Sequence, residues 1–221
     1  MTAPAGNTRE DHPRQLRLYS SCELPTEFGL FRIAVYHAEE EREHLLVHKG
    51  ELTQDEPLFV RIHSECYTGE VLGSLKCDCR SQLHSAMKEI DVRGRGAIVY
   101  LRQEGRGIGL GNKIRAYAEQ EKGANTIEAN ERIGFPADMR DYSLAAMMLE
   151  LNSIRRVIIN TNNPEKVAAL QRAGIQVTEV IPSTSQPNPH NVDYLRTKYE
   201  GLGHSGLKSV VHDDDCNSRS G

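Results

Sequence analysis

The sequence predicts a mixed α/β fold built on one mixed sheet, with a β-rich N-terminal half and an αβαβ C-terminal half. In the first half, apolar residues alternate over Leu30–Tyr36, Leu45–His48 and Leu58–His63, and Gly, Pro or acidic residues separate these runs. From Arg80 onward the apolar spacing becomes helical, and helical segments then alternate with short β-branched runs. A β-rich front followed by alternating elements is typical of a mixed α/β domain.

The C-terminal half is expected to hold helices and strands in turn. Helical spacing of apolar residues begins after Arg80, at Leu110 and at Tyr142. A further helix is expected at Asn163, a good N-cap that is followed by Pro164 at the first helical position. The expected strands are Ala97–Leu101, Arg156–Asn160 and Ile175–Ile181, and a last helix is expected over Val192–Tyr199.

Length and composition predict a single working domain. The 221 residues are enough to bury one sizeable core. We expect the domain to span residues 18–204, because the stretches 1–17 and 205–221 are polar and are expected to form a flexible arm and a disordered tail. The opening residues lack the apolar region of a signal peptide, so a cytoplasmic protein is expected.

Charge and hydropathy argue against two classes of partner. No apolar run approaches the roughly 20 residues needed to cross a bilayer. The 27 basic and 31 acidic side chains give a net charge of −4, which argues against bulk binding of nucleic acid. This balance still permits a local basic pocket for a small polyanion. We therefore expect a small-molecule ligand, with neither a membrane nor a nucleic-acid partner.

Three of the five cysteines, Cys66, Cys77 and Cys79, crowd into one segment, and without an export signal this crowding favours metal binding over disulfides. A Cys-x-Cys pair in extended backbone projects both sulfurs to one side, and soft sulfur ligands favour zinc. Three protein ligands would leave one position for a water of lowered pKa, as in catalytic zinc sites. If His63 or His84 supplied a fourth ligand, the ion would be structural, and the spacing leaves both interpretations open.

A glycine-rich stretch from Arg102 to Lys113 follows an expected strand and opens an expected helix. Backbone N–H groups bind phosphates in this context, although the stretch lacks the ending of a Walker loop and the third glycine of a dinucleotide fingerprint. Taken alone, it is interpreted as a tight turn. Glu104 there could accept hydrogen bonds from a guanine edge, and Arg106 could pair with phosphate.

Two further polar segments are candidates with ordinary alternatives. Asp138 and Arg140 lie two apart, so their side chains would point the same way in an extended loop, where a surface salt bridge capping the Tyr142 helix is the alternative. The run from Asn160 to Lys166 joins a buried strand to a helix N-terminus, a place that ligands favour. Lys166 opposes the helix dipole there unless an anion is present, and a solvated lysine is the alternative.

Together these motifs resemble the GTP cyclohydrolase II family. The similarity extends over residues 24–204, nearly the whole sequence outside the two terminal stretches. Several long motifs in the family order make it far more specific than any one of them. The motifs are Arg61-Ile62-His63-Ser64-Glu65-Cys66, Leu75-Lys76-Cys77-Asp78-Cys79, Arg102-Gln103-Glu104-Gly105-Arg106-Gly107-Ile108-Gly109-Leu110, Asn112-Lys113-Ile114-Arg115-Ala116-Tyr117 and Thr161-Asn162-Asn163-Pro164.

The resemblance implies a zinc-dependent hydrolase that opens the imidazole ring of GTP and releases formate and pyrophosphate. The implied product is 2,5-diamino-6-ribosylamino-4(3H)-pyrimidinone 5′-phosphate, and the reaction is the first step of riboflavin biosynthesis. One Zn²⁺ per chain, held by three cysteines and a water, Mg²⁺ with the GTP phosphates, and a homodimer are implied as well. No butanone-phosphate synthase half is expected within the 221 residues.

The resemblance also implies roles for individual residues. Cys66, Cys77 and Cys79 would ligate zinc. Tyr117, Asp138 and Arg140 match catalytic positions, with Asp138 as proton acceptor and Arg140 as a nucleophile or, as we expect from its high pKa, an electrostatic clamp at the α-phosphorus. The implied GTP-binding residues are Arg61, Ile62, His63, Ser64, Glu65, Gln82, Glu104, Gly105, Arg106, Thr126, Thr161 and Lys166.

Two departures from the family pattern leave alternatives open. The segment 182–190 is more polar than the family leads us to expect, and an acidic tail replaces the usual apolar ending after His204. One alternative is a paralogue of another pathway that stops at a formamidopyrimidine product. Independently of these departures, a protein of a different class is an alternative: a zinc-stabilised guanine-nucleotide binding protein without turnover, in which His63 or another group would fill the fourth zinc position.

Overall fold

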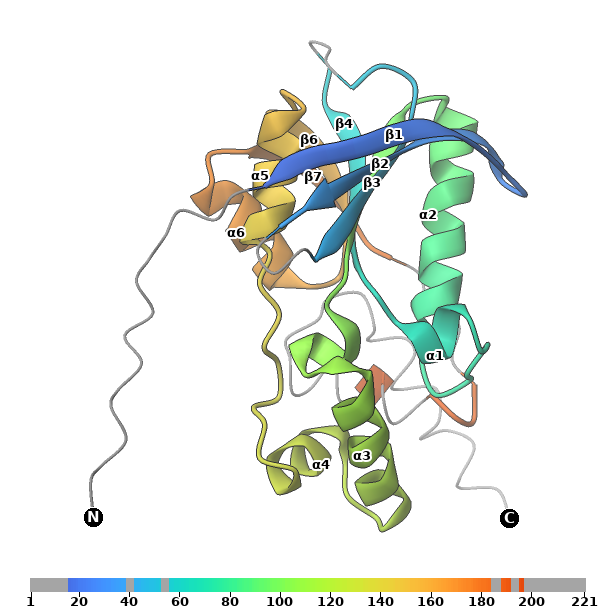
Figure 1. Ribbon diagram of the computed structural model, residues 1–221, viewed down its shortest axis with the longest axis vertical. Coiled ribbons are helices and arrows are strands. Elements are labelled where there is room, and N and C mark those ends of the chain that lie inside the picture. Colours follow the sequence, from blue (N-terminus) through green and yellow to red (C-terminus); the bar gives the residue numbers. More distant parts are fainter. Residues whose placement is uncertain (1–15, 39–41, 53–55, 184–187, 192–194, 197–221) are drawn as a thin grey trace, which may run out of the picture.

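The computed structural model describes residues 16–38, 42–52, 56–183, 188–191 and 195–196. Over these residues the chain forms a seven-stranded mixed sheet in the order β1-β2-β3-β5-β4-β6-β7, with helices on both faces, so the predicted fold class is confirmed (Figure 1). The strands are β1 (Arg17–Thr26), β2 (Gly29–His37), β3 (Glu43–Lys49), β4 (Leu58–Ser64), β5 (Gly96–Leu101), β6 (Arg156–Asn160) and β7 (Gln176–Ile181).

The sheet changes character at β5. Strands β1, β2, β3 and β5 pair antiparallel, whereas β5, β4, β6 and β7 pair parallel. The interior strand β4 is buried from Leu58 to His63, as expected for a continuous run of mostly apolar residues in a strand covered on both faces. Because β4, β5 and β6 run in the same direction, their carboxyl ends lie at one edge of the sheet, where ligand sites of α/β proteins form.

Helices cover the two faces of the sheet and extend beyond it (Figure 1). On one face, Ala86 and Ile90 of α2 pack against Phe59 and Ile98, and the other face holds the larger core with the buried side of α5 and α6. Helices α3 and α4 form a small lobe below the sheet. The helical segments are α1 (Tyr67–Glu70), α2 (Cys79–Arg93), the 3-10 turn η2 (Glu104–Gly107), α3 (Gly109–Glu121), α4 (Thr126–Arg132), α5 (Ser143–Leu151) and α6 (Pro164–Arg172).

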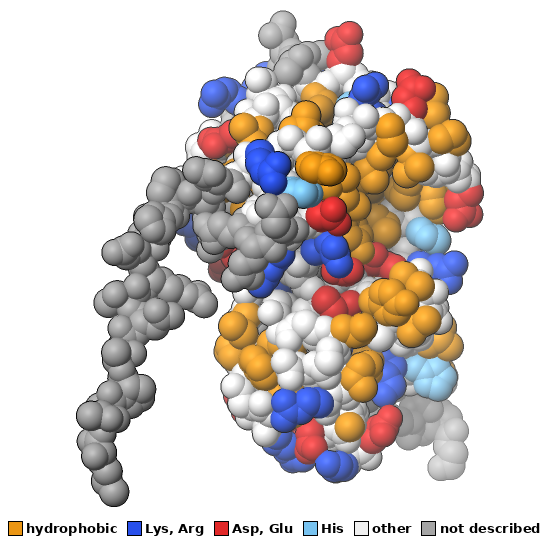
Figure 2. All heavy atoms as spheres, in the orientation of Figure 1, with side chains coloured by type: hydrophobic (Ala, Val, Ile, Leu, Met, Phe, Trp, Pro, Cys, Tyr) orange, Lys and Arg blue, Asp and Glu red, His pale blue; other side chains and the backbone are white. Residues whose placement is uncertain are grey.

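In the same orientation, the space-filling view shows this lobe as the lower part of the molecule, with hydrophobic and charged side chains mixed over the visible face (Figure 2). Over the described part of the chain, no helix combines the length and the apolar character needed to cross a membrane.

Most predicted elements are present, and three were not anticipated. The sequence pattern predicted no strand over Arg17–Thr26, and neither α1 nor α4 was expected. The predicted tail 205–221 lies outside the described residues, as do residues 1–15 of the predicted arm and most of the helix predicted over 192–199.

Candidate functional site

A cavity of about 770 Å³ lies at the carboxyl ends of β4 and β5, between the sheet and the α3–α4 lobe. Eleven of the residues predicted for the site line it: Ser64, Glu65, Cys66, Cys77, Cys79, Glu104, Gly105, Arg106, Tyr117, Thr126 and Arg140. The lining also carries five Lys or Arg side chains, namely Lys76, Arg106, Lys113, Arg140 and Arg196, against the carboxylates of Glu65 and Glu104. A protein of negative net charge therefore has a locally basic cavity suited to a polyanion.

The three thiols converge on the wall of this cavity. Cys66 follows β4 and precedes α1, Cys77 lies in the next loop, and Cys79 is the first residue of α2. Their sulfur atoms all lie within 4.8 Å of one another, and the Sγ atoms of Cys66 and Cys77 are 3.6 Å apart. Three soft donors at this spacing could hold one metal ion and suit zinc.

Neither predicted alternative ligand joins the thiols. His63 uses both ring nitrogens elsewhere: Nδ1 accepts from Arg61 Nε at 3.1 Å, and Nε2 lies 2.9 Å from Glu70 Oε1. The His84 ring lies against Phe28, with ring centroids 4.8 Å apart. Among the described residues, the group that could hold a metal contains the three cysteines and no histidine or carboxylate. The donor count is therefore the one expected for a site that keeps a position open.

Lys113 of α3 supplies positive charge beside the thiols. Its Nζ donates to Cys66 Sγ at 3.1 Å and to Glu104 Oε1 at 2.8 Å. Glu104 also accepts from the backbone N–H groups of Tyr67 and Gly105, at 2.5 and 2.7 Å. Hydrogen bonds from the neighbouring thiols and the Lys113 ammonium lower the pKa of Cys66, which favours its thiolate. The Glu104 carboxylate thus fixes the turn that carries it and orients Lys113.

Gly69 leaves the space into which the sulfur atoms project. A Cβ atom built at this position would lie 2.7 Å from Cys77 Sγ and 3.2 Å from Cys66 Sγ. We expect Gly69→Ala to displace a thiol and to weaken zinc binding at least roughly tenfold, the scale seen when the surroundings of metal ligands are disturbed. Competition with a colorimetric chelator measures this affinity.

Gly111→Ala is the matched control for that substitution, because Gly111 lies in α3 with a negative φ and a Cβ there would meet no atom within 4 Å. Its zinc affinity should equal that of the parent. Equal affinities for the parent and Gly69→Ala would show that the sulfur atoms do not close on the ion from this side.

The second charged group at the cavity is the pair Asp138 and Arg140. Arg140 Nε donates to Asp138 Oδ1 at 2.9 Å and Nη2 donates to Oδ2 at 2.5 Å, with the Arg140 and Asp138 side chains 14% and 28% exposed. Asp138 is an exposed residue, so the surface salt bridge expected as the alternative is present. The N–H of Ser143 at the start of α5 donates to Asp141 Oδ1 at 2.8 Å, so Asp141 and not this pair caps the helix. Burial raises the pKa of Asp138, but hydrogen bonds and charge from Arg140 outweigh this and lower it.

The loop that carries this pair is fixed to the glycine-rich turn. Arg106 adopts a left-handed φ of 59°, which is uncommon outside glycine and occurs at functional sites, and its carbonyl accepts from Met139 N at 3.0 Å. The Gln103 amide binds both backbone groups of Asp141, donating to its carbonyl at 2.9 Å and accepting from its N–H at 2.8 Å. Tyr117 of α3 faces the cavity beneath Lys76, whose Nζ lies 4.8 Å from the ring centroid.

The remaining predicted residues do not line the cavity. Arg61, Ile62 and His63 are buried, Gln82 is hydrogen-bonded to Arg61, and Asp138 is an exposed residue hydrogen-bonded to Arg140. Thr161 and Lys166 lie at the end of β6 and the start of α6, and both are buried. The alternative of a solvated Lys166 was wrong, because its Nζ donates to the Ile62 carbonyl at 2.7 Å and lies 5.5 Å from the Tyr142 ring centroid.

Sequence reasoning assigned no role to several residues that shape the site. Lys113 and Gln103 lie within the family motifs, and Gln103 is directly beside Glu104, so their positions in the sequence indicated a place near the site. Glu70 was missed, although burial raises the pKa of its carboxyl group to about 7. Its only signal in the sequence was its place four residues after Cys66.

These features define a class: a mixed α/β protein with a three-thiol metal site on the wall of a basic cavity at the carboxyl edge of its sheet. Comparison with known proteins gives the family. The sequence model of the GTP cyclohydrolase II family matches residues 17–182, and the chain belongs to that family.

Curated relatives cover most of the chain. It is 55% identical over 185 residues to GTP cyclohydrolase-2 of Teredinibacter turnerae, covering 83% of this chain and 93% of that protein. It is 52% identical over 190 residues to GTP cyclohydrolase-2 of Saccharophagus degradans, covering 86% and 95%. A longer relative, riboflavin biosynthesis protein RibBA of a Synechocystis strain, is 46% identical over 92% of this chain and 37% of that protein. The resemblance inferred from the motifs is confirmed.

Proposed function

We propose that this chain is a zinc-dependent GTP cyclohydrolase II, which opens the imidazole ring of GTP and releases formate and pyrophosphate in the first step of riboflavin biosynthesis. One observation carries the proposal: three converging thiols share a cavity wall with five basic side chains. Such a site can serve both ends of GTP, because a metal can activate water for the base and positive charge can stabilise the phosphates.

The cavity residues divide between these two tasks. A zinc ion held by Cys66, Cys77 and Cys79 would supply a Lewis acid that activates water for attack at C8. Tyr117 would orient or protonate a departing ring nitrogen, and burial raises its pKa, so it carries its proton at neutral pH. Arg140 would hold the α-phosphate by charge, since a protonated guanidinium is a poor nucleophile.

The predicted role of Asp138 as proton acceptor agrees with its pKa. Its pKa is lowered, so the carboxylate is ionised at neutral pH, as a proton acceptor must be. Hydrogen bonds from Arg140 also make it a weaker base while the two are paired. We propose that, before GTP binds, Asp138 chiefly holds the Arg140 side chain in the position from which it would contact the phosphates.

Ser64, Glu65, Glu104, Gly105, Arg106 and Thr126 line the cavity and are the proposed direct contacts for GTP. Contacts of Thr161 and Lys166 with the nucleotide stay a prediction, as does Mg²⁺ bound with the phosphates. The proposal includes a cytoplasmic homodimer, whose subunit count light scattering would measure.

The test is to incubate the zinc-loaded protein with GTP and Mg²⁺, to identify the products by mass spectrometry and to assay formate and pyrophosphate. The diaminopyrimidinone with both by-products in equal amounts is the expected result. A formamidopyrimidine without formate would replace the proposal by the paralogue, and bound, unchanged GTP would replace it by the binding protein.

The hydrogen bonds of Gln103 to Asp141 predict that Gln103 holds the loop that carries Asp138 and Arg140. Gln103→Glu keeps an acceptor for the Asp141 N–H but removes the donor to its carbonyl, so the loop should shift. We expect kcat to fall about 10- to 100-fold with little change in KM, because small misplacements of catalytic groups have effects of this size.

Steady-state kinetics of product formation test this expectation. Gln171→Glu makes the same chemical change at an exposed position of α6 and should leave kcat unchanged. An unaltered kcat in Gln103→Glu would show that the loop keeps its place without the amide.

A further inference from the structure

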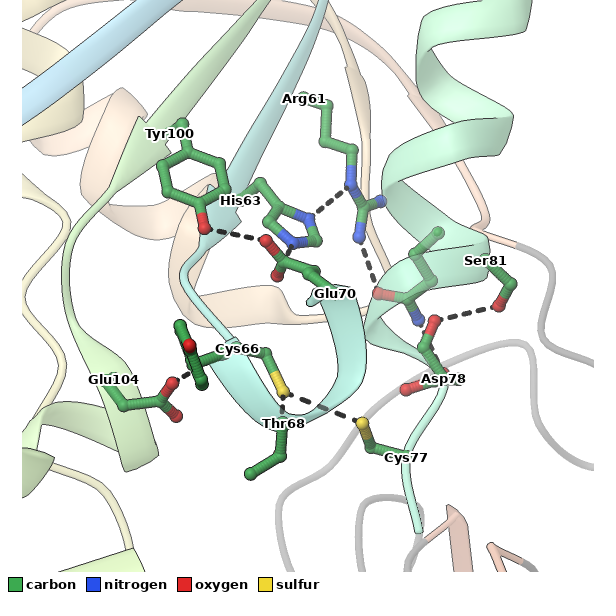
Figure 3. Close-up of polar contacts among 12 residues, drawn as sticks. Arg61, His63, Cys66, Thr68, Glu70, Cys77, Asp78, Ser81, Tyr100 and Glu104 are labelled. Atoms are coloured by element: carbon green, nitrogen blue, oxygen red, sulfur yellow. Dashed lines mark hydrogen bonds and ion pairs between the residues drawn. The ribbon is translucent and has the colours of Figure 1, made fainter. Parts of the chain in front are cut away.

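Behind the thiols, a buried guanidinium is joined to two carboxyl groups through two neutral side chains (Figure 3). On one side, Arg61 Nε donates to His63 Nδ1 at 3.1 Å, and His63 Nε2 lies 2.9 Å from Glu70 Oε1. On the other side, Arg61 Nη2 donates to Gln82 Oε1 at 2.5 Å, and Gln82 Nε2 donates to Asp78 Oδ2 at 2.6 Å. The polar groups therefore form one continuous chain of hydrogen bonds.

The protonation states of this chain follow from its contacts. Burial and the positive charge of Arg61 lower the pKa of His63 well below its ordinary value, so the ring is neutral. Since Nδ1 accepts from Arg61, Nε2 carries the proton and donates to Glu70. Tyr100 donates to the second Glu70 oxygen at 2.6 Å. Glu70 thus accepts two hydrogen bonds from the sheet, one from β4 and one from β5.

The two carboxyl groups at the ends belong to the two segments that carry the thiols. Glu70 is the last residue of α1, and its backbone N–H donates to the Cys66 carbonyl at 2.8 Å. Asp78 stands between Cys77 and Cys79, and its Oδ2 accepts from Gln82 of α2. Arg61 lies between the two ends and is only 3% exposed.

We propose that this buried network, made of Asp78, Gln82, Arg61, His63, Glu70 and Tyr100, sets the distance between the two thiol-bearing segments, with Glu70 as the positioning residue for Cys66. The inference rests on the metal site of the proposed function. It gives Arg61, His63 and Gln82 a task behind the cavity wall, in keeping with the positions of their side chains.

The hydrogen bonds of Arg61 favour one arrangement of the buried network. Arg61 further donates to Asn160 Oδ1 at 2.9 Å and to Ser183 Oγ at 3.0 Å, so its guanidinium is fixed to β6 and to the segment after β7. Leaving a buried donor without its acceptor costs free energy, so the network favours one position for each of the two carboxyl groups. Partners behind metal ligands typically change metal affinity 10- to 100-fold when replaced.

The test compares Glu70→Gln and Tyr100→Phe with the parent as full-length, zinc-loaded proteins. In the first variant the amide has one oxygen in place of two, so it cannot accept from both donors in the parental arrangement. The second variant removes one donor while keeping the ring. Zinc affinity is measured by chelator competition, and ligand geometry by the visible spectrum of the Co²⁺-substituted protein. We expect Glu70→Gln to bind zinc roughly tenfold more weakly or worse with altered Co²⁺ bands, and Tyr100→Phe to show a smaller shift of the same kind.

Tyr36→Phe is the matched control. The Tyr36 hydroxyl is also enclosed, donating to Asn152 Oδ1 at 3.1 Å and accepting from Nδ2 at 2.8 Å, but it belongs to the core against α5. This variant should have a lower melting temperature, with zinc affinity and Co²⁺ bands unchanged. Parental affinity and bands in both Glu70→Gln and Tyr100→Phe would overturn the inference alone. A parent protein that binds no zinc would overturn the proposed function with it.

Discussion

Replacing Cys77 by serine is expected to abolish both zinc binding and formate release. Its Sγ lies 3.6 Å from that of Cys66, and the described residues offer no histidine or carboxylate at the group to take its place. A serine hydroxyl is a harder and far less acidic ligand than a thiol, so two thiols alone would remain. Activation of water by a metal is worth several kcal/mol, which corresponds to a loss of roughly a thousandfold or more in rate.

Cys22→Ser provides the control for this result. Cys22 is an exposed free cysteine on β1, on an edge strand that does not line the cavity. This variant should keep the zinc content and the rate of the parent, measured by elemental analysis and by a formate assay. Substantial formate release from Cys77→Ser would contradict the assignment of the thiols to the reaction.

Replacing Arg140 by glutamine is expected to reduce pyrophosphate release about 100- to 1,000-fold, the range for loss of one group that stabilises transition-state charge. The guanidinium lines the cavity and is held by Asp138, so it is already directed before a substrate arrives. Zinc content should not change, because the thiols that would hold the ion are left intact. Arg140→Lys should recover part of the rate, since its charge is kept.

The activity of Arg140→Lys distinguishes an electrostatic role of Arg140 from a covalent one. A pyrophosphate assay on Arg140→Gln, Arg140→Lys and the parent makes the comparison. Arg172→Gln serves as control, because this arginine is exposed on α6 beside Glu165. A lysine variant as inactive as the glutamine variant would favour a requirement for the guanidinium itself.

The sequence pattern was sufficient for the buried part of the fold. The run Leu58–His63 predicted β4 to within one residue, and Asn163 with Pro164 predicted the start of α6. The strand β1 was not predicted, because its first nine residues are exposed and its sequence therefore shows no alternation of apolar and polar residues. Helix α4 was not predicted, although Asn125 and Glu128 form a capping box whose residues are a helix-start signal in the sequence.

The site was predictable in its ligands and less so in its supporting contacts. The spacing of Cys66, Cys77 and Cys79 was enough to place three thiols together. The direction of the His63 side chain depends on Glu70 and Arg61, which meet only in the folded protein. A solvated Lys166 was the ordinary expectation because its contact, the Ile62 carbonyl, lies 104 residues away in sequence. Motifs therefore identify donors, whereas tertiary contacts decide where those donors point.

The most direct test of the account is a zinc titration. Metal-free protein would be titrated with Zn²⁺ in the presence of GTP and Mg²⁺, while formate release is followed at each point. The account predicts negligible release without zinc and a linear rise that ends at one zinc per chain, with the Cys77→Ser protein inactive throughout. Full formate release from protein shown to be metal-free would contradict it.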